Sequence, residues 1–221
     1  MQKDIFILLK KEIKQEWRQR YAIQGVLLYL ASTIFICYIS FHLKSNTLNP
    51  TSWNALFWII SLFISTNAIT KSFLQEKEER QLYYYTLTSP QAIILSKIIY
   101  NSILLIILLT IGFVFYQLFM GNFVHNLGLF FSILVLAAIG FSSTLTMVAA
   151  IASKANNSHL LVPILSFPIL IPLLLNIIKV SKRSLEEIQV VSSDKEIGTL
   201  IGLNVIVITL SYLLFPYIWR K

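Results

Sequence analysis

Six long apolar segments divide this sequence, and an amphipathic stretch precedes them. The apolar segments cover residues 22–43, 54–72, 92–119, 127–152, 160–178 and 197–218. Each is close to the length of about 20 residues that an α-helix needs to cross a bilayer. The pattern therefore predicts an all-α integral membrane protein, with six transmembrane helices in a single domain over residues 1–221. The third and fourth segments are long enough to tilt or break.

The amphipathic stretch covers residues 1–20. Ile5, Leu9, Ile13 and Trp17 recur every four residues, and lysines and arginines occupy the other faces. This arrangement is typical of a helix that lies in the headgroup layer of a membrane. We expect an N-terminal interfacial helix that contacts membrane lipid, with Trp17 as its membrane anchor. Binding of a soluble partner to the same face is the alternative.

The composition supports the membrane interpretation. Hydrophobic residues make up 56% of the chain and charged residues only 13%, which is about half the charged fraction of a soluble domain. The net charge of +8 is spread over the ends of the apolar segments, so it indicates orientation in the membrane and no nucleic-acid partner. Most of the 18 Lys and Arg residues fall on the side of the two termini, so both termini are expected in the cytoplasm.

A charged and aromatic connector, residues 75–91, separates the second and third apolar segments. Its members are Glu76, Lys77, Glu78, Glu79 and Arg80, followed by Leu82, Tyr83, Tyr84 and Tyr85. Charged groups beside large aromatic side chains are typical of a surface that binds another protein. We expect a cytoplasmic segment that contacts a soluble ATPase, and a solvated loop is the alternative. Ser89 and Pro90 predict the N-cap and first position of the next helix.

Later segments carry features of helix packing and movement. Pro163, Pro168 and Pro172 interrupt the backbone hydrogen bonds of the fifth segment, which predicts kinks that suit gating or have a purely structural role. Small residues gather in the fourth segment, and the sixth opens with Gly198 and Gly202 at GxxxG spacing; these faces pack within one chain or between two copies. Residues 179–196 form a polar outer segment, long enough for a short exposed helix.

Catalytic chemistry is not apparent in the sequence. Cys37 is the single cysteine, the ten acidic residues fall outside the apolar segments, and the three histidines show no metal-ligand spacing. No glycine is followed by lysine, so the phosphate-binding loop of ATPases is absent. We therefore expect no catalytic residue, no metal site and no directly bound cofactor, and an ATPase that drives this protein would be a separate chain.

Two stretches carry a family resemblance. Residues 73–97, FLQEKEERQLYYYTLTSPQAIILSK, and residues 160–175, LLVPILSFPILIPLLL, resemble the CcmB family of heme exporter permeases in cytochrome c maturation. The matching residues are Leu82, Leu87 and Lys97 in the first stretch, and Pro168, Ile171 and Pro172 in the second. Arg80 departs from the pattern, which has a glycine in the connector.

The resemblance implies the permease fold of type-2 ABC exporters and a place in the bacterial inner membrane. It implies a homodimer that binds a CcmA-like ATPase, CcmC-like and CcmD-like membrane subunits and a CcmE-like periplasmic heme chaperone. The complex would handle heme and the partner would bind ATP, for heme export or for release of the heme-loaded chaperone. The alternatives are a permease for a lipid-linked glycan or a drug, and a non-transporting assembly scaffold; an intramembrane enzyme ranks third.

Overall fold

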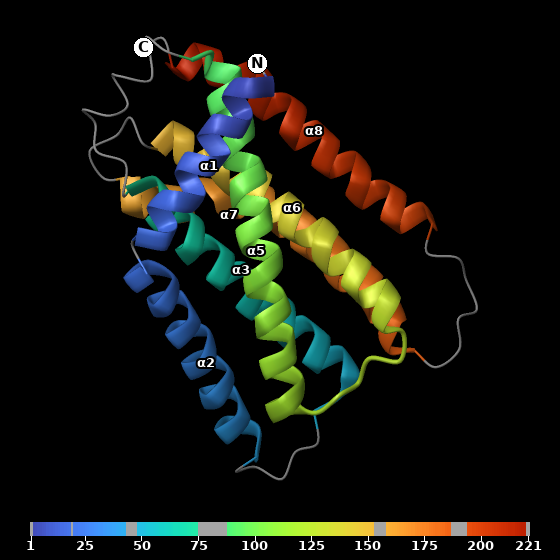
Figure 1. Cartoon of the computed structure of the whole chain (residues 1–221). Helices are drawn as coiled ribbons and strands as arrows, with labels where there is room; N and C mark the ends of the chain where they lie inside the picture. Colours follow the sequence, from blue (N-terminus) through green and yellow to red (C-terminus); the bar gives the residue numbers. More distant parts are fainter. Residues whose placement is uncertain are drawn as a thin grey trace.

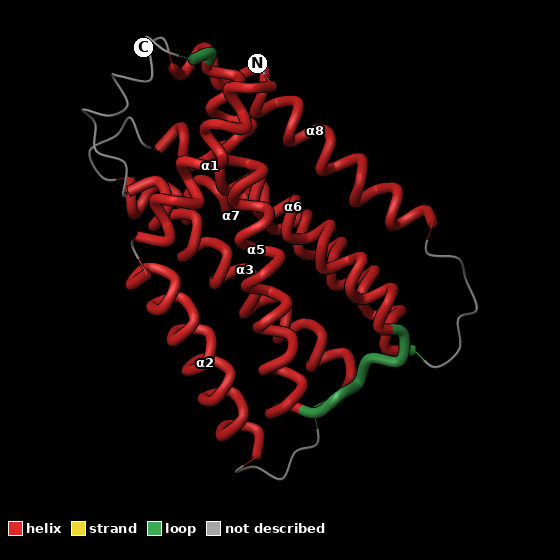
Figure 2. Tube along the Cα trace, viewed as in Figure 1, coloured by secondary structure: helices red, strands yellow, loops and turns green. Residues whose placement is uncertain are grey.

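Helices make up every regular element in the described part of the chain (Figure 2). The computed structural model describes residues 2–18, 20–42, 48–74, 88–152, 158–186 and 194–219. The helices are α1 (Gln2–Arg18), α2 (Arg20–His42), α3 (Pro50–Leu74), α5 (Pro90–Met120), α6 (Leu127–Ala152), α7 (Ser158–Lys182) and α8 (Asp194–Trp219), with the 3-10 helix η1 (Arg183–Leu185) after α7. The predicted all-α class is confirmed.

Six of these helices, α2, α3, α5, α6, α7 and α8, are long and apolar enough to cross a membrane. They agree with the six predicted segments, and α5 and α6 run without a break. The predicted start of the second segment was too late, because α3 begins at Pro50. The side chain of Asn49 accepts a hydrogen bond from Thr51 N at 3.3 Å, so a polar N-cap residue opens this helix ahead of its apolar part.

α6 is the central helix of the bundle. It packs against α3, α5, α7 and α8, and 78% of its span is buried, whereas α2 and α8 bury only 17% of theirs. Figure 1 shows α1, the start of α5 and the end of α8 at one end of the bundle. We call this the α1 end, and the opposite end, where residues 121–126 join α5 to α6, the far end.

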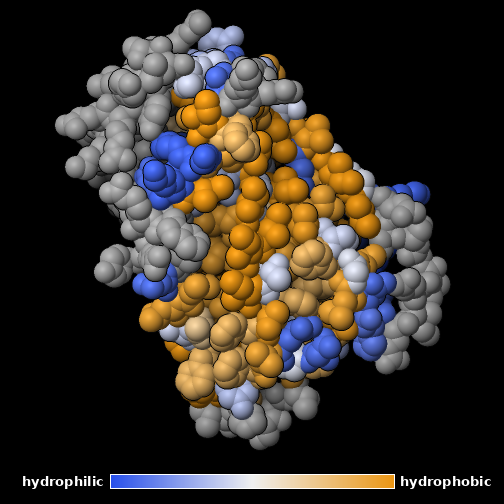
Figure 3. Space-filling model, in the orientation of Figure 1, coloured by the Kyte–Doolittle hydropathy of each residue, from blue (hydrophilic) through white to orange (hydrophobic). Residues whose placement is uncertain are grey.

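Apolar side chains cover most of the visible surface between α2 and α8 (Figure 3). Large hydrophobic residues such as Leu28 on α2, Leu118 on α5 and Leu213 on α8 are more than half exposed. Such a surface would aggregate in water, whereas hydrocarbon chains of a bilayer cover it without cost. The outer surface is therefore that of a multi-pass membrane protein.

The small residues of the fourth segment pack within the chain. The following small residues are buried in α6: Ala137, Ala138, Gly140, Ser142, Ser143, Thr144, Ala149, Ala150 and Ala152. A Cβ atom added at Gly140 would stand 2.5 Å from Asn204 Oδ1 of α8, so this glycine permits the close approach of the two helices. The GxxxG glycines differ, because a Cβ at Gly198 or Gly202 would meet nothing within 4 Å.

Candidate functional site

The predicted ATPase-binding residues lie outside the described residues. These are Glu76, Lys77, Glu78, Glu79, Arg80, Leu82, Tyr83, Tyr84 and Tyr85. The described remainder of the connector is 88–91, which leads directly into α5. Ser89 is extended (φ −71°, ψ 139°), and its carbonyl accepts hydrogen bonds from Ala92 N and Ile93 N at 3.0 and 3.3 Å. The predicted helix start is confirmed, although the Ser89 hydroxyl makes no capping hydrogen bond.

α1 rests on the first turns of α5. Leu8 of α1 is buried in a small apolar cluster at the α1 end; its other members are Ala92, Ile93, Ile94 and Ile98 of α5, Ala150 of α6 and Phe215 of α8, with Ile5 at the edge. The contact joins the N-terminal helix to three of the spans. The helix thus belongs to the bundle and is more than an attachment to the headgroup layer.

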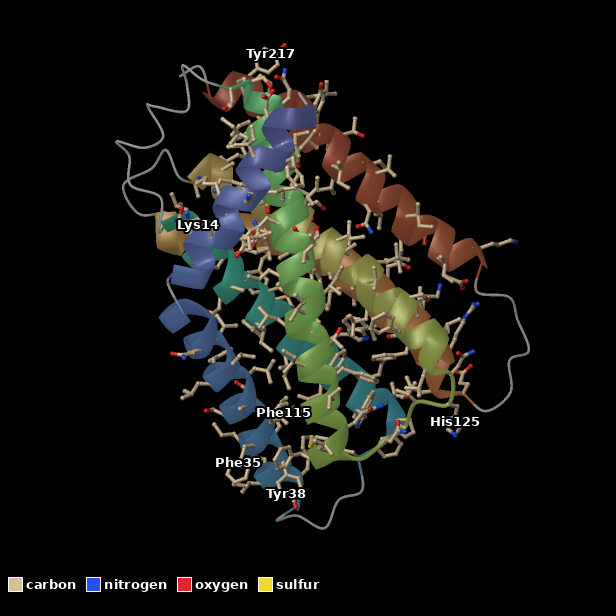
Figure 4. The ribbon with its side chains drawn as sticks, viewed as in Figure 1. Lys14, Phe35, Tyr38, Phe115, His125 and Tyr217 are labelled. Carbon is tan, nitrogen blue, oxygen red and sulfur yellow. The ribbon has the colours of Figure 1, made fainter. Side chains whose placement is uncertain are left out.

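The buried face of α1 differs from the predicted stripe. Leu8 and Glu12 are buried, whereas Ile13 is 55% exposed and Phe6 is 69% exposed. α1 therefore has two apolar faces, one against α5 and one turned outward, with exposed Lys10 and Lys14 between the apolar positions. Trp17 lies within α1, but its side chain is outside the described part. Figure 4 shows Lys14 on α1, at the opposite end from His125.

Glu12 and Lys97 form a buried ion pair between α1 and α5. The distance from Lys97 Nζ to Glu12 Oε1 is 3.6 Å, and the two side chains are only 7% and 8% exposed. Lys11 Nζ also contacts Glu12 Oε1, at 3.0 Å, from a more exposed position. Removing one partner of a buried pair leaves an uncompensated charge and costs about 3–5 kcal/mol. The pair thus makes the packing of α1 on α5 dependent on charge as well as on apolar area.

Polar side chains continue from Lys97 into the interface of α5 and α6. Asn101 Nδ2 donates to Thr146 Oγ1 at 2.9 Å, and Ser142 Oγ donates to the Ile98 carbonyl at 3.0 Å. Asn101 Oδ1 and Thr144 Oγ1 are buried without a hydrogen-bond partner among the described residues. Because lipid offers no replacement partner, these cross-helix bonds hold α5 and α6 in one register.

A second polar group lies at the far end, within a cluster of aromatic rings. Trp58 Nε1 donates to Asn54 Oδ1 at 3.0 Å and to Ser181 Oγ at 2.7 Å, and Asn54 Nδ2 donates to the Ile178 carbonyl at 2.9 Å. These bonds join α3 to the end of α7. Tyr116 Oη of α5 donates to the Trp53 carbonyl of α3 at 3.0 Å, so α5 is joined to α3 as well.

The aromatic rings around these bonds come from four segments of the chain. Phe130 is the centre, with its ring centroid 4.6 Å from that of Phe113 and between 5.5 and 6.2 Å from those of Trp53, Phe57 and Trp58. The tryptophans are scattered in sequence, yet Trp53 and Trp58 are together fully buried here. The far end is thus tightly packed, and the aromatic rings of this cluster contact one another.

Trp58→Phe is expected to lower the free energy of unfolding by about 1–3 kcal/mol, because the N–H donor is lost and the smaller phenyl ring leaves part of the buried space of the indole unfilled. Unfolding of the purified protein by sodium dodecyl sulfate in mixed micelles measures the change. Ser132→Ala is the control, since its exposed hydroxyl bonds only within α6, to Leu129 O. Equal stability of Trp58→Phe and the wild type would show that the buried indole N–H adds nothing.

The three prolines of the fifth segment all lie inside α7. Pro163 is half-buried, whereas Pro168 and Pro172 face outward and are exposed. The outward position means that the described helices of this chain do not cover the second and third prolines. Their predicted role in kinking or gating stays a prediction.

The described residues of the outer segment 179–196 lie at the end of α7, in and just after η1, and at the start of α8. The short exposed helix that its length allows stays a prediction. α7 continues to Lys182, and η1 follows with Ser184 and Leu185 buried. The Ser184 carbonyl accepts from His125 N and Asn126 N at 3.0 Å each, and Arg183 pairs with Glu196. The described part of this segment is therefore attached to the loop 121–126. Within the described residues, no three His, Cys, Asp or Glu side chains gather as a metal ion would require.

Sequence reasoning missed the partnership of Glu12 with Lys97. Lys97 stands inside an apolar run, and a lysine there needs a carboxylate close by. Glu12 follows Leu8 by one helical turn, so the two residues share a face of α1. This spacing could have indicated that Glu12 is buried beside Leu8.

Comparison with known proteins identifies the family. The family described as CcmB protein has a model that matches residues 3–218, nearly the whole chain. A search of curated proteins finds no match.

Proposed function

This chain belongs to the CcmB protein family, and from that membership we propose that it is the permease subunit of an ABC-type complex in cytochrome c biogenesis. Family membership supports a role in heme export for cytochrome c maturation. We propose that a separate subunit hydrolyses ATP, and that the complex exports heme or releases a heme-loaded periplasmic chaperone. The chain itself supplies movement and no catalytic group.

The match of the family model to residues 3–218 carries this proposal, because it includes all six spans and the N-terminal helix. The position of the connector supports it. The connector includes Pro90, the first residue of α5, and α1 rests on the turns of α5 that follow. A force applied to the connector would therefore act on two elements at once.

The connector is the proposed contact with the ATPase. Glu76, Glu78, Glu79 and Arg80, with Lys77 beside them, would form charge pairs with that subunit. Leu82 and Tyr83–Tyr85 would provide the buried anchors, since aromatic side chains supply much of the binding energy of protein interfaces. Charge complementarity would select the correct partner.

The remaining partners follow from the family. We propose a homodimer with a CcmA-like ATPase, CcmC-like and CcmD-like membrane subunits and a CcmE-like chaperone. We propose that the protein lies in a bacterial inner membrane with the α1 end on the cytoplasmic side, because both chain ends and most Lys and Arg residues belong to that side. The exposed apolar residues Phe6, Ile7 and Ile13 of α1, with Lys10 and Lys14, suit contact with membrane lipid.

Reversing two acids of the connector tests the proposal. Glu78→Lys with Glu79→Lys is expected to lower co-purification of the ATPase by about tenfold or more, because two charge pairs become repulsive. Membrane insertion should stay unchanged, since both residues lie outside the spans. The measurement is the ratio of ATPase to permease after affinity purification from a bacterial strain that expresses the complete complex.

Glu186→Lys is the matched control, because Glu186 is exposed after η1 at the far end. It should leave the ratio unchanged. An unaltered ratio in the connector variant would contradict the contact. Normal c-type cytochromes in a strain that lacks the permease gene would contradict the role in cytochrome c biogenesis.

A further inference from the structure

A charged contact joins the N-terminal helix to the span that follows the connector. Glu12 of α1 and Lys97 of α5 are both more than nine-tenths buried, and their charged atoms are 3.6 Å apart. The surrounding contact is apolar, through Leu8, Ile94 and Ile98 among others. Apolar packing alone is compatible with several arrangements of α1 on α5. The ion pair therefore distinguishes the observed arrangement from the others.

Charge restricts how α1 can sit on α5. A buried ion pair gains little stability over apolar residues of the same size, but it penalises any arrangement that leaves one charge unpaired. A slip of α1 by one helical turn would move Glu12 about 5.4 Å along its axis and break the pair. The pair thus fixes the register of α1 on α5.

The position of the pair relates it to the connector. Lys97 lies about two turns inside α5, roughly 10 Å from Pro90 at the rise of an α-helix. α1 ends at Arg18 and α2 begins at Arg20, so a displacement of α1 acts directly on α2. α2 buries only 17% of its span, and it packs directly on α3 and α5 as well as on α1.

We propose that Glu12 and Lys97 are positioning residues that make α1 and α5 move as one body, so that a movement at the start of α5 reaches α1. This inference rests on the proposed function. It adds a mechanical link from the start of α5 through the ion pair to α1. Neither residue touches the transported species or ATP.

Replacing both charges by leucine separates positioning from folding. Glu12→Leu with Lys97→Leu keeps apolar packing, so the complex should assemble in normal amount, whereas the yield of c-type cytochrome per ATP hydrolysed should fall by about tenfold. The exchange Glu12→Lys with Lys97→Glu restores an ion pair between α1 and α5 but places a lysine beside Lys11, so it should recover part of that yield. Ser132→Ala, an exposed change on α6, should have no effect.

Spin labels measure the register itself. Cys37 is the single cysteine, so Cys37→Ser permits labels at Lys10→Cys on α1 and Ile99→Cys on α5, both exposed positions. In the purified complex the label distance should be narrow, and equal with and without a non-hydrolysable ATP analogue. In the leucine variant the distribution should broaden, and in the exchange variant it should narrow again.

Three results would overturn the inference: a wild-type label distance that changes with the ATP analogue, a leucine variant with normal cytochrome yield, or a leucine variant that fails to assemble. The last would show a role in folding alone. The label distance in the nucleotide-free state needs no ATPase. If no ATPase co-purifies with the wild-type chain, the proposed function is refuted. The label distance in the nucleotide-free state can still be measured in that case, and it decides whether the pair fixes α1 on α5.

Discussion

Phe130→Ala should destabilise the protein by about 3–5 kcal/mol, the cost of removing a fully buried phenylalanine from a close-packed site. The ring of Phe130 contacts Phe57, Trp58 and Phe113, and its exposure is 0%. The surrounding rings come from different helices that hydrogen bonds such as Tyr116 Oη to Trp53 O hold in place, so they cannot collapse into the space. Unfolding in mixed micelles, followed by tryptophan fluorescence, measures the loss.

Phe131 provides the matched control for this change. It is the next residue of α6, it is 46% exposed and it faces outward. Because lipid fills the space that its ring leaves, Phe131→Ala should change the stability by less than about 1 kcal/mol. Equal losses for the two variants would show that the aromatic cluster packs no more tightly than the lipid-facing surface.

Gly140→Ala should destabilise the protein by about 2–4 kcal/mol, through overpacking and the loss of a buried hydrogen bond. The added Cβ would stand 2.5 Å from Asn204 Oδ1 and 3.0 Å from Leu173 Cδ2. Asn204 must then rotate, which breaks its Nδ2 bond to the Leu136 carbonyl at 3.0 Å. The gain of about 1 kcal/mol in helix propensity from alanine offsets only part of this loss.

Gly202→Ala is the control for Gly140→Ala, since both glycines lie inside helices and only the first meets neighbouring atoms. A Cβ at Gly202 meets nothing within 4 Å, so the stability of the single chain should stay equal or rise slightly. Unfolding by sodium dodecyl sulfate in mixed micelles compares the two variants. A wild-type stability for Gly140→Ala would mean that α6 and α8 do not approach as closely as the structure has them.

The spans were predictable from the sequence because each depends on a local property, the run of apolar residues. The segment 127–152 coincides with α6. Errors arose where polar residues belong to a helix. α3 begins at Pro50, ahead of its apolar run, and α7 continues past the predicted end through Lys179 and Lys182. At both ends the backbone stays helical because tertiary contacts and capping continue beyond the hydrophobic part.

The contacts between helices were not predictable in the same way. Glu12 and Lys97 are 85 positions apart in the sequence, and their meeting depends on how α1 folds back onto α5. Trp53 and Trp58 are on one helix, but the rings that enclose them come from α5, α6 and the chain between these helices. Such contacts depend on three-dimensional packing, which periodicity along one helix does not encode.

The central place of α6 has a consequence for biogenesis. Of its four neighbouring helices, α7 and α8 follow α6 in the chain and are therefore synthesised after it. Until they enter the bilayer, the surface that bears Gly140 faces lipid or the insertion machinery instead of Asn204 and Leu173. A chain without α7 and α8 would leave this surface of α6 without its partners. This surface of α6 is therefore covered only when both α7 and α8 have entered the bundle.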